Sequence, residues 1–72
     1  MRQVNQRYLQ IGKRIKDERE SMGWTQVRLS RESGVTQPNI SEMESGKRAM
    51  HVFTAMKICD ALGVSIDWLL RG

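Results

Sequence analysis

Two side-chain amides, Gln37 and Asn39, stand close together in the middle of the chain, with Pro38 between them. Thr36 precedes them, so a helix is expected to begin here with Pro38 in its first turn. The amide of Asn or Gln can form two hydrogen bonds with the N6/N7 edge of adenine in the major groove. A helix start also presents free N–H groups to phosphate. These residue types are suited to nucleic-acid chemistry, although two amides at a helix start, taken alone, are more often ordinary solvated side chains.

The charge of the chain is uneven. It carries 12 basic and 8 acidic residues, a net charge of +4. The whole excess lies within residues 1–48, and four of its basic residues flank the amides: Arg28, Arg31, Lys47 and Arg48. A positive excess favours an anionic partner. The alternative is that these side chains only solvate the helices that carry them.

Apolar residues recur at spacings of three and four, and no segment alternates over the length of a strand, so we expect an all-α fold. Glycines fall where short helices would close. The predicted domain covers residues 1–72, with 1–6 flexible and helices over about 5–22, 26–33, 36–44, 52–62 and 66–70. The predicted inward-facing residues are Tyr8, Ile11, Ile15, Met22, Val27, Leu29, Val35, Ile40, Met43, Val52, Ala55, Met56, Cys59 and Leu62. Gly12, inside the first helix, is expected to cost about 1 kcal/mol against alanine.

The stretch from Thr25 to Arg48 encodes a helix, a tight turn at Gly34 and a second helix. Its apolar positions have the spacing of a helix-turn-helix, in which the first helix and the turn hold the second helix at a fixed crossing angle. Such a unit projects the start of its second helix, where the two amides lie, from the body of the domain.

Residues 11–70 resemble the helix-turn-helix family of lambdoid phage repressors and Cro proteins, often called the Xre family. The likeness rests on three segments in order: IGKRIKDERESMGWTQ, RLSRESGVTQPNISEMESGKR and ALGVSIDWLL. It implies a compact five-helix, lambda-repressor-like domain. It also implies a dimeric transcriptional repressor that binds a pseudo-palindromic operator in double-stranded DNA, with the second helix of the motif in the major groove.

The resemblance assigns roles by position. Base reading is implied for Gln37, Pro38, Asn39 and Glu42. Phosphate contacts are expected at Thr25, Gln26, Ser41, Ser45, Lys47 and Arg48, and Gln26 is also implied to brace Gln37. Arg19 and Glu44 match a buried ion pair between the first and third helices. Pro38 is expected to make apolar contact, and Glu42 either accepts from a cytosine amino group or repels phosphate.

One departure from the family pattern carries an expectation of its own, and two further features leave alternatives open. Met50 and His51 replace the family's usual Pro-Ser, and we expect a looser start to the fourth helix because histidine caps less well than serine. Tyr8 and the basic segment before it extend past the family's usual start, as an arm that reaches DNA or as a disordered tail. Trp68 belongs either to the core or to a dimer contact.

Other functional classes are constrained by composition. The chain holds one cysteine, Cys59, and one histidine, His51, so no metal or cofactor is expected. An enzyme is disfavoured because no nucleophilic set or glycine-rich phosphate loop is present. A lone cysteine fits a reducing, cytoplasmic location, and no apolar run approaches the roughly 18 residues of a membrane span. A protein-interaction module, such as an antitoxin with a toxin partner, is the alternative function.

Overall fold

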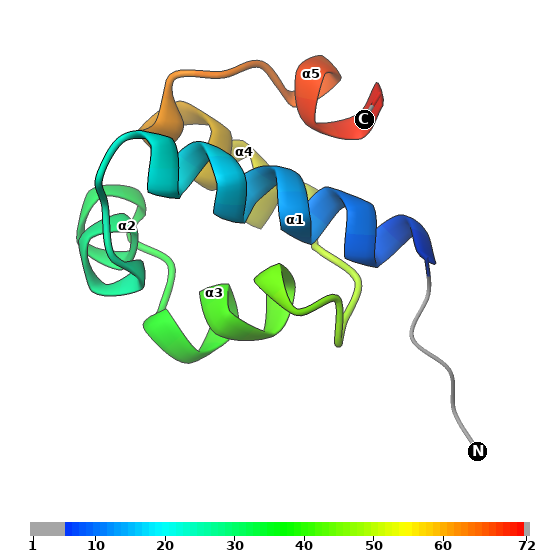
Figure 1. The fold of residues 1–72 in the computed structure, drawn as a ribbon, viewed down its shortest axis with the longest axis horizontal. Helices are drawn as coiled ribbons and strands as arrows, with labels where there is room; N and C mark the ends of the chain where they lie inside the picture. The colour runs from blue at the N-terminus through cyan, green and yellow to red at the C-terminus, as the bar shows by residue number, and fades with distance from the viewer. Residues whose placement is uncertain (1–5, 72) are drawn as a thin grey trace.

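Residues 6–71 are described by the computed structural model, and they form helices without any strand. The helices are α1 (Gln6–Ser21), α2 (Gln26–Ser33), α3 (Gln37–Glu44), α4 (Val52–Leu62) and α5 (Ile66–Arg71). In Figure 1, α1 crosses the middle of the molecule, with α3 on one side of it and α5 on the other. The predicted all-α fold of five helices is confirmed. Of the segment expected to be flexible, Gln6 is the first residue of α1, and residues 1–5 lie outside the described part.

Thr25 and Thr36 occupy the N-cap positions of α2 and α3, but only Thr25 caps its helix with its side chain. The Oγ1 atom of Thr25 accepts a hydrogen bond from the Arg28 amide at 3.0 Å, as expected of an N-cap. Thr36 occupies the N-cap position of α3, but its side chain makes no cap hydrogen bond, which corrects the prediction. Pro38, the second residue of α3, has no N–H, so Asn39 is the only usual amide partner for the Thr36 hydroxyl, and that hydrogen bond is not formed.

The start of α4 differs from the expectation of weak capping. The Nδ1 atom of His51 accepts from the Phe53 amide at 3.2 Å, and the two rings stack with centroids 5.5 Å apart. The imidazole therefore serves as the cap acceptor that serine would supply, and it adds a ring contact that serine lacks.

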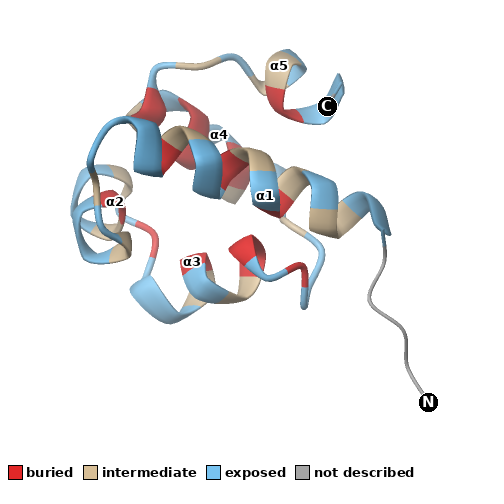
Figure 2. Cartoon of the chain, in the orientation of Figure 1, coloured by how far each residue is buried: buried red, intermediate tan, exposed pale blue. Residues whose placement is uncertain are grey.

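Each helix supplies one fully buried aliphatic side chain to a single core: Ile15, Leu29, Ile40, Ile58 and Leu69. Buried positions, red in Figure 2, occur on every helix. The sequence prediction missed Ile58 and Leu69 as core residues. It wrongly placed four exposed side chains inside: Met22, Val27, Val52 and Met56.

The reason for these errors is geometric. α1 ends at Ser21, so Met22 lies in the following turn and leaves the helical face that its spacing suggested. In α4 the buried stripe runs through Ala55, Ile58, Cys59 and Leu62, and Met56 lies a residue further round the helix. Val27 lies two residues from buried Leu29, and residues two apart on a helix do not share a face.

The backbones of α1 and α3 approach each other closely at Gly12. A Cβ atom at Gly12 would lie 2.9 Å from the carbonyl oxygen of Glu44 and would overlap that of Met43. The glycine therefore permits a backbone contact that any side chain would prevent. The sequence prediction counted only its cost in helix propensity.

Within residues 6–71, none of the helices is long and apolar enough to cross a membrane. Cys59 is buried on the core face of α4, as predicted. Desolvation by this burial raises the pKa of its thiol, and the charge of Asp60 adds to the effect.

Candidate nucleic-acid interface

The α2–α3 unit presents one face of α3 to solvent. Gly34 closes α2 in the left-handed conformation, with φ of 77°, and buried Val35 anchors the turn that follows. Ile40, Met43 and Glu44 form the buried side of α3. Most of the predicted DNA-contacting residues of α3 lie away from that side: Gln37, Pro38 and Ser41 are exposed, and Asn39 and Glu42 are half-buried.

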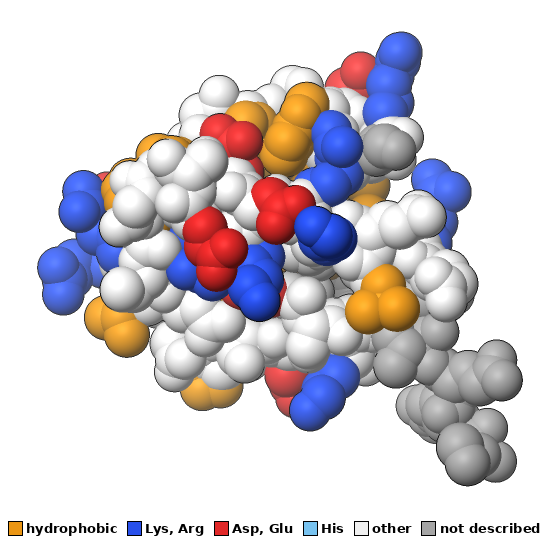
Figure 3. Space-filling view, in the orientation of Figure 1, with side chains coloured by type: hydrophobic (Ala, Val, Ile, Leu, Met, Phe, Trp, Pro, Cys, Tyr) orange, Lys and Arg blue, Asp and Glu red, His pale blue; other side chains and the backbone are white. Residues whose placement is uncertain are grey.

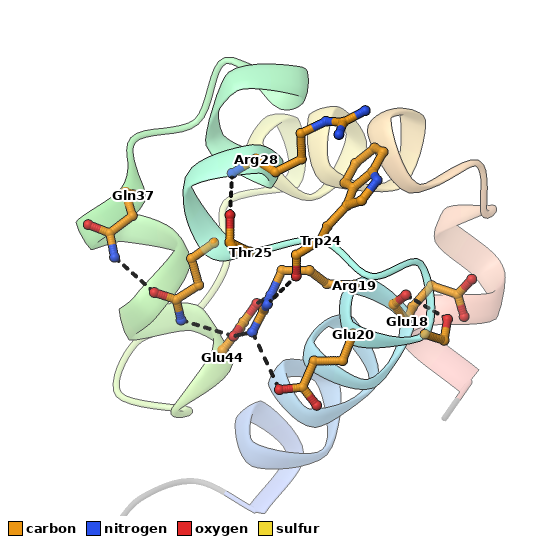
Figure 4. A network of polar contacts seen from close by, with 10 residues as sticks. Glu18, Arg19, Glu20, Trp24, Thr25, Arg28, Gln37 and Glu44 are labelled. Atoms are coloured by element: carbon orange, nitrogen blue, oxygen red, sulfur yellow. Dashed lines mark hydrogen bonds and ion pairs between the residues drawn. The ribbon is translucent and has the colours of Figure 1, made fainter.

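A buried ion pair joins α1 to the end of α3. The Nε atom of Arg19 lies 2.7 Å from Oε2 of Glu44, and Nη2 lies 2.9 Å from Oε1. The two side chains are only 8% and 3% exposed. Arg19 also donates to the carbonyl oxygen of Trp24 at 2.7 Å, so one guanidinium ties α1, the α1–α2 turn and α3 together (Figure 4). The hydrogen bond to Glu44 raises the pKa of Arg19, although burial opposes it.

The network continues from the ion pair to the exposed start of α3. The Nε2 atom of Gln26 donates to Oε1 of Glu44 at 3.0 Å. The Oε1 atom of Gln26 accepts from Nε2 of Gln37 at 2.9 Å. Figure 4 shows these hydrogen bonds in line between Glu44 and Gln37. Gln26 therefore lies where the resemblance places it, beside Gln37. Its contact with Glu44 was missed, because the two residues are far apart in sequence and share no helix.

The end of α3 carries an ion pair that sequence reasoning also missed. Nε of Arg48 lies 2.9 Å from Oε1 of Glu42, and both side chains are about half exposed. Two residues assigned separate DNA contacts therefore engage each other in the free protein. Lys47 is exposed and has no ion pair within residues 6–71. Of the two cations, Lys47 is the one already free to meet phosphate.

Two hydroxyl groups assigned to phosphate are partly engaged. Thr25 accepts at its cap but keeps its O–H hydrogen for another acceptor. Ser45 donates its hydrogen to the Glu42 carbonyl oxygen at 3.1 Å. Ser41 is exposed on α3. Thr25 and Ser41 are thus better placed than Ser45 to donate to a phosphate oxygen.

Both tryptophans pack under arginine side chains. The guanidinium carbon of Arg14 lies 4.2 Å from the ring centroid of Trp68, and Nη2 of Arg14 donates to the Trp68 carbonyl at 2.9 Å. The guanidinium carbon of Arg28 lies 4.7 Å from the Trp24 ring. Both rings are half-buried against the core. Trp68 therefore has the core contact that one of the two alternatives required.

The outer face of α1 offers no single-sign surface. Figure 3 shows acidic and basic side chains interleaved over this helix. One such pair is Lys13 and Asp17, whose Nζ and Oδ2 atoms lie 2.9 Å apart. The basic residues of α1 are thus partly neutralised by their own helix, whereas Lys47 next to α3 is not.

Comparisons with known proteins agree with this geometry. A helix-turn-helix family model matches residues 15–69. The SPbeta prophage-derived uncharacterized HTH-type transcriptional regulator YonR of Bacillus subtilis (strain 168) is 38% identical over 62 residues, 86% of this chain and 57% of the relative. The HTH-type transcriptional regulator for conjugative element R391 of Providencia rettgeri is 37% identical over 62 residues, 86% of this chain and 28% of the relative. The chain thus spans only part of the length of either relative.

Among solved structures, the biofilm regulator SinR in complex with DNA is similar in fold, with a TM-score of 0.80 and 30% identity. The match covers 83% of this chain and 97% of that one. The fold and the α2–α3 geometry define a helix-turn-helix domain. The chain belongs to the Xre-type helix-turn-helix family, and the two relatives named above are transcriptional regulators.

Proposed function

We propose that this chain binds double-stranded DNA in a sequence-specific manner, reads the major groove with α3, and acts as a transcriptional repressor in the cytoplasm. The observation that carries the proposal is the hydrogen bond from Gln37 to Gln26, which holds an exposed amide at the tip of α3. A reading side chain held before binding loses less rotamer freedom when it meets a base. The DNA complex of the related SinR supports the same partner here.

In this proposal the residues divide by chemistry. Gln37 and Asn39 hydrogen-bond base edges, Pro38 makes apolar contact, and Glu42 selects against some bases or backbone positions. Phosphates are bound by charged or hydroxyl groups and by Gln26 around the same face: Thr25, Gln26, Ser41, Ser45, Lys47 and Arg48. The buried pair of Arg19 and Glu44 holds α3 in place without touching DNA.

We further propose that the chain acts as a homodimer on a pseudo-palindromic site. Four large apolar side chains are exposed on α4 and α5: Val52, Phe53, Met56 and Leu70. Val52 and Leu70 line one pocket of about 310 Å³. Burying this apolar surface against a second copy would remove it from water. We include the half-buried Trp68 of α5 in the proposed surface, because aromatic side chains are enriched at protein interfaces.

Selection of bound duplexes from random DNA, followed by footprinting, tests the proposal. An enriched motif with two-fold symmetry and half-sites about one helical turn apart is the expected result. Absence of any enriched motif would overturn sequence-specific binding. It would then favour the alternative in which the exposed apolar residues of α4 bind a different protein, such as a toxin. Sedimentation of the unsubstituted protein and of Phe53→Ser separates these cases. If the protein is a homodimer, Phe53→Ser should convert it to a species with the mass of a monomer; a monomer should be unaffected.

A further inference from the structure

The hydrogen-bond chain from α1 to the tip of α3 has a direction. Glu44 accepts from Arg19 at both carboxylate oxygens, at 2.7 and 2.9 Å. An ionised carboxylate has no proton to donate. Its contact with Gln26 at 3.0 Å therefore requires the Nε2 group of Gln26 to face it. Turning the Gln26 amide over would place two acceptor oxygens against each other in a nearly fully buried position.

The orientation of Gln26 determines that of Gln37. With its Nε2 group facing Glu44, Gln26 presents Oε1 to α3, and an amide oxygen can only accept. Gln37 must then face it with Nε2, and the two atoms are 2.9 Å apart. One Nε2 hydrogen of Gln37 is thus committed. Its second Nε2 hydrogen and its Oε1 atom, which has no hydrogen-bond partner within residues 6–71, remain for an external ligand.

We propose that Glu44, acting through Gln26, sets which end of the Gln37 amide donates and which accepts, and so contributes to base specificity without touching DNA. Glu44 is then a positioning residue as well as half of an ion pair. The inference rests on the proposed function, because it names how that same site chooses its base. A fixed donor and acceptor side by side match the N7 acceptor and N6 donor of adenine. A Gln37 amide free to turn can instead direct its Nε2 group to the acceptors of guanine or thymine.

The donor-to-acceptor direction of this series of hydrogen bonds can be measured without DNA. Gln37→Glu replaces the required donor by an acceptor, and Gln37→Met removes hydrogen bonding at similar length. If Gln26 is held by Glu44, Gln37→Glu places two acceptors together. The quantity to compare is the unfolding equilibrium constant of Gln37→Glu divided by that of Gln37→Met. This ratio should be about fivefold larger when Gln26 is present than in a Gln26→Met background. The background comparison cancels the general effect of a charge at the helix start. An equal difference in the two backgrounds, or one that favours glutamate beside Gln26, would overturn the proposal.

Glu44 itself is tested with the paired substitution Arg19→Gln and Glu44→Gln, which leaves no unpaired buried charge. Glutamine at position 44 can donate or accept, so Gln26 becomes free to turn. The extra penalty of Gln37→Glu should then disappear, and persistence of the penalty in a folded double variant would contradict the role of Glu44. Should the double variant fail to fold, the Gln26→Met comparison above decides the matter.

The base preference supplies a readout that a purely structural role would not move. Gln26→Met keeps the ion pair and frees the Gln37 amide. Selection from random duplexes should still enrich the motif, with a lower adenine preference at the one position whose preference is lost in Gln37→Ala. Unchanged preference there would overturn the inference while leaving the proposed function intact. If the unsubstituted protein enriches no motif, the proposed function itself is contradicted. The stability comparison would then still test the direction of the hydrogen bonds between Glu44, Gln26 and Gln37.

Discussion

Arg48 and Glu42 face each other across the end of α3, with Nε and Oε1 2.9 Å apart, so the proposed DNA face carries a paired cation and anion. Exposed pairs of this kind contribute about 0–1 kcal/mol to stability. The pair therefore opens at little cost, and its main effect is on charge: Glu42 neutralises one cation that would otherwise attract phosphate.

Glu42→Gln should strengthen binding to random DNA, because it removes a negative charge and releases Arg48. The slope of log affinity against log salt concentration should become more negative by about one unit, as expected for one additional phosphate contact. Anisotropy titrations at several salt concentrations measure both quantities. Asp67→Asn is the matched control: Asp67 pairs with Arg71 at 3.0 Å in α5, on the other side of α1. An equal gain in the control would show that only net charge matters.

Gln37→Ala should weaken binding to the selected site by about 1–3 kcal/mol and leave binding to scrambled duplexes almost unchanged. The reason is that base contacts distinguish sequences and phosphate contacts do not. Titrations with the two duplexes give the comparison. Gln10→Ala, an exposed amide of α1, serves as the control and should change neither affinity. Equal losses on both duplexes for Gln37→Ala would argue against base reading.

Lys47→Ala should weaken selected and scrambled DNA alike and reduce the salt slope by about one. Lys47 is exposed beside α3 and is not engaged in an ion pair within the described residues. Lys57→Ala removes the same charge from the exposed side of α4 and should leave the slope nearly unchanged. Matching slopes for the two variants would contradict a specific phosphate contact at Lys47.

Gly12→Ala should destabilise the fold, although alanine is the better helix former by about 1 kcal/mol. The added Cβ would overlap the backbone of α3, which cannot move like a flexible side chain. Overpacking of this kind costs about 1–3 kcal/mol. Chemical denaturation measures the free energy of unfolding, with Gln10→Ala in the same helix as the control. A more stable Gly12→Ala protein would mean that α1 and α3 do not meet at this point.

The buried thiol of Cys59 should make the free energy of unfolding depend on pH in the alkaline range. Desolvation raises its pKa in the folded chain above the ordinary value of 9.0, so the unfolded chain loses this proton first. The contribution of this thiol to the free energy of unfolding is therefore complete below that pH and decreases as the pH rises above it. Unfolding free energies from about pH 8 to about pH 10 should decline more steeply than in Cys59→Ala. Parallel profiles would show that the thiol contributes nothing.

Local chemistry made much of the fold predictable. The bounds of α2 follow from Thr25 and Gly34, whose effects act within a few residues of each helix end. The spacing of apolar residues was a weaker guide, because it did not distinguish buried Ile58 from exposed Met56 in α4. The fold determines which side of that helix meets α2.

The site was predictable only where a family pattern carries it. The resemblance placed Arg19 beside Glu44 and Gln26 beside Gln37, and both contacts are present. Contacts outside the pattern used for the resemblance were not foreseen, such as that of Arg14 with Trp68. These pairings depend on how the helices pack, and no spacing along the chain encodes them.

The hydrogen-bond chain also affects how new binding specificities can arise. Gln37 is tied to Gln26 and Glu44, so an acceptor at position 37 needs a compensating change elsewhere. Pro38 and Asn39 lie outside that chain. Under the proposed function, substitutions at these two positions would alter DNA preference one step at a time without leaving a buried group unpaired. Evolution or design would thus reach new operators first through positions 38 and 39, and only later through position 37.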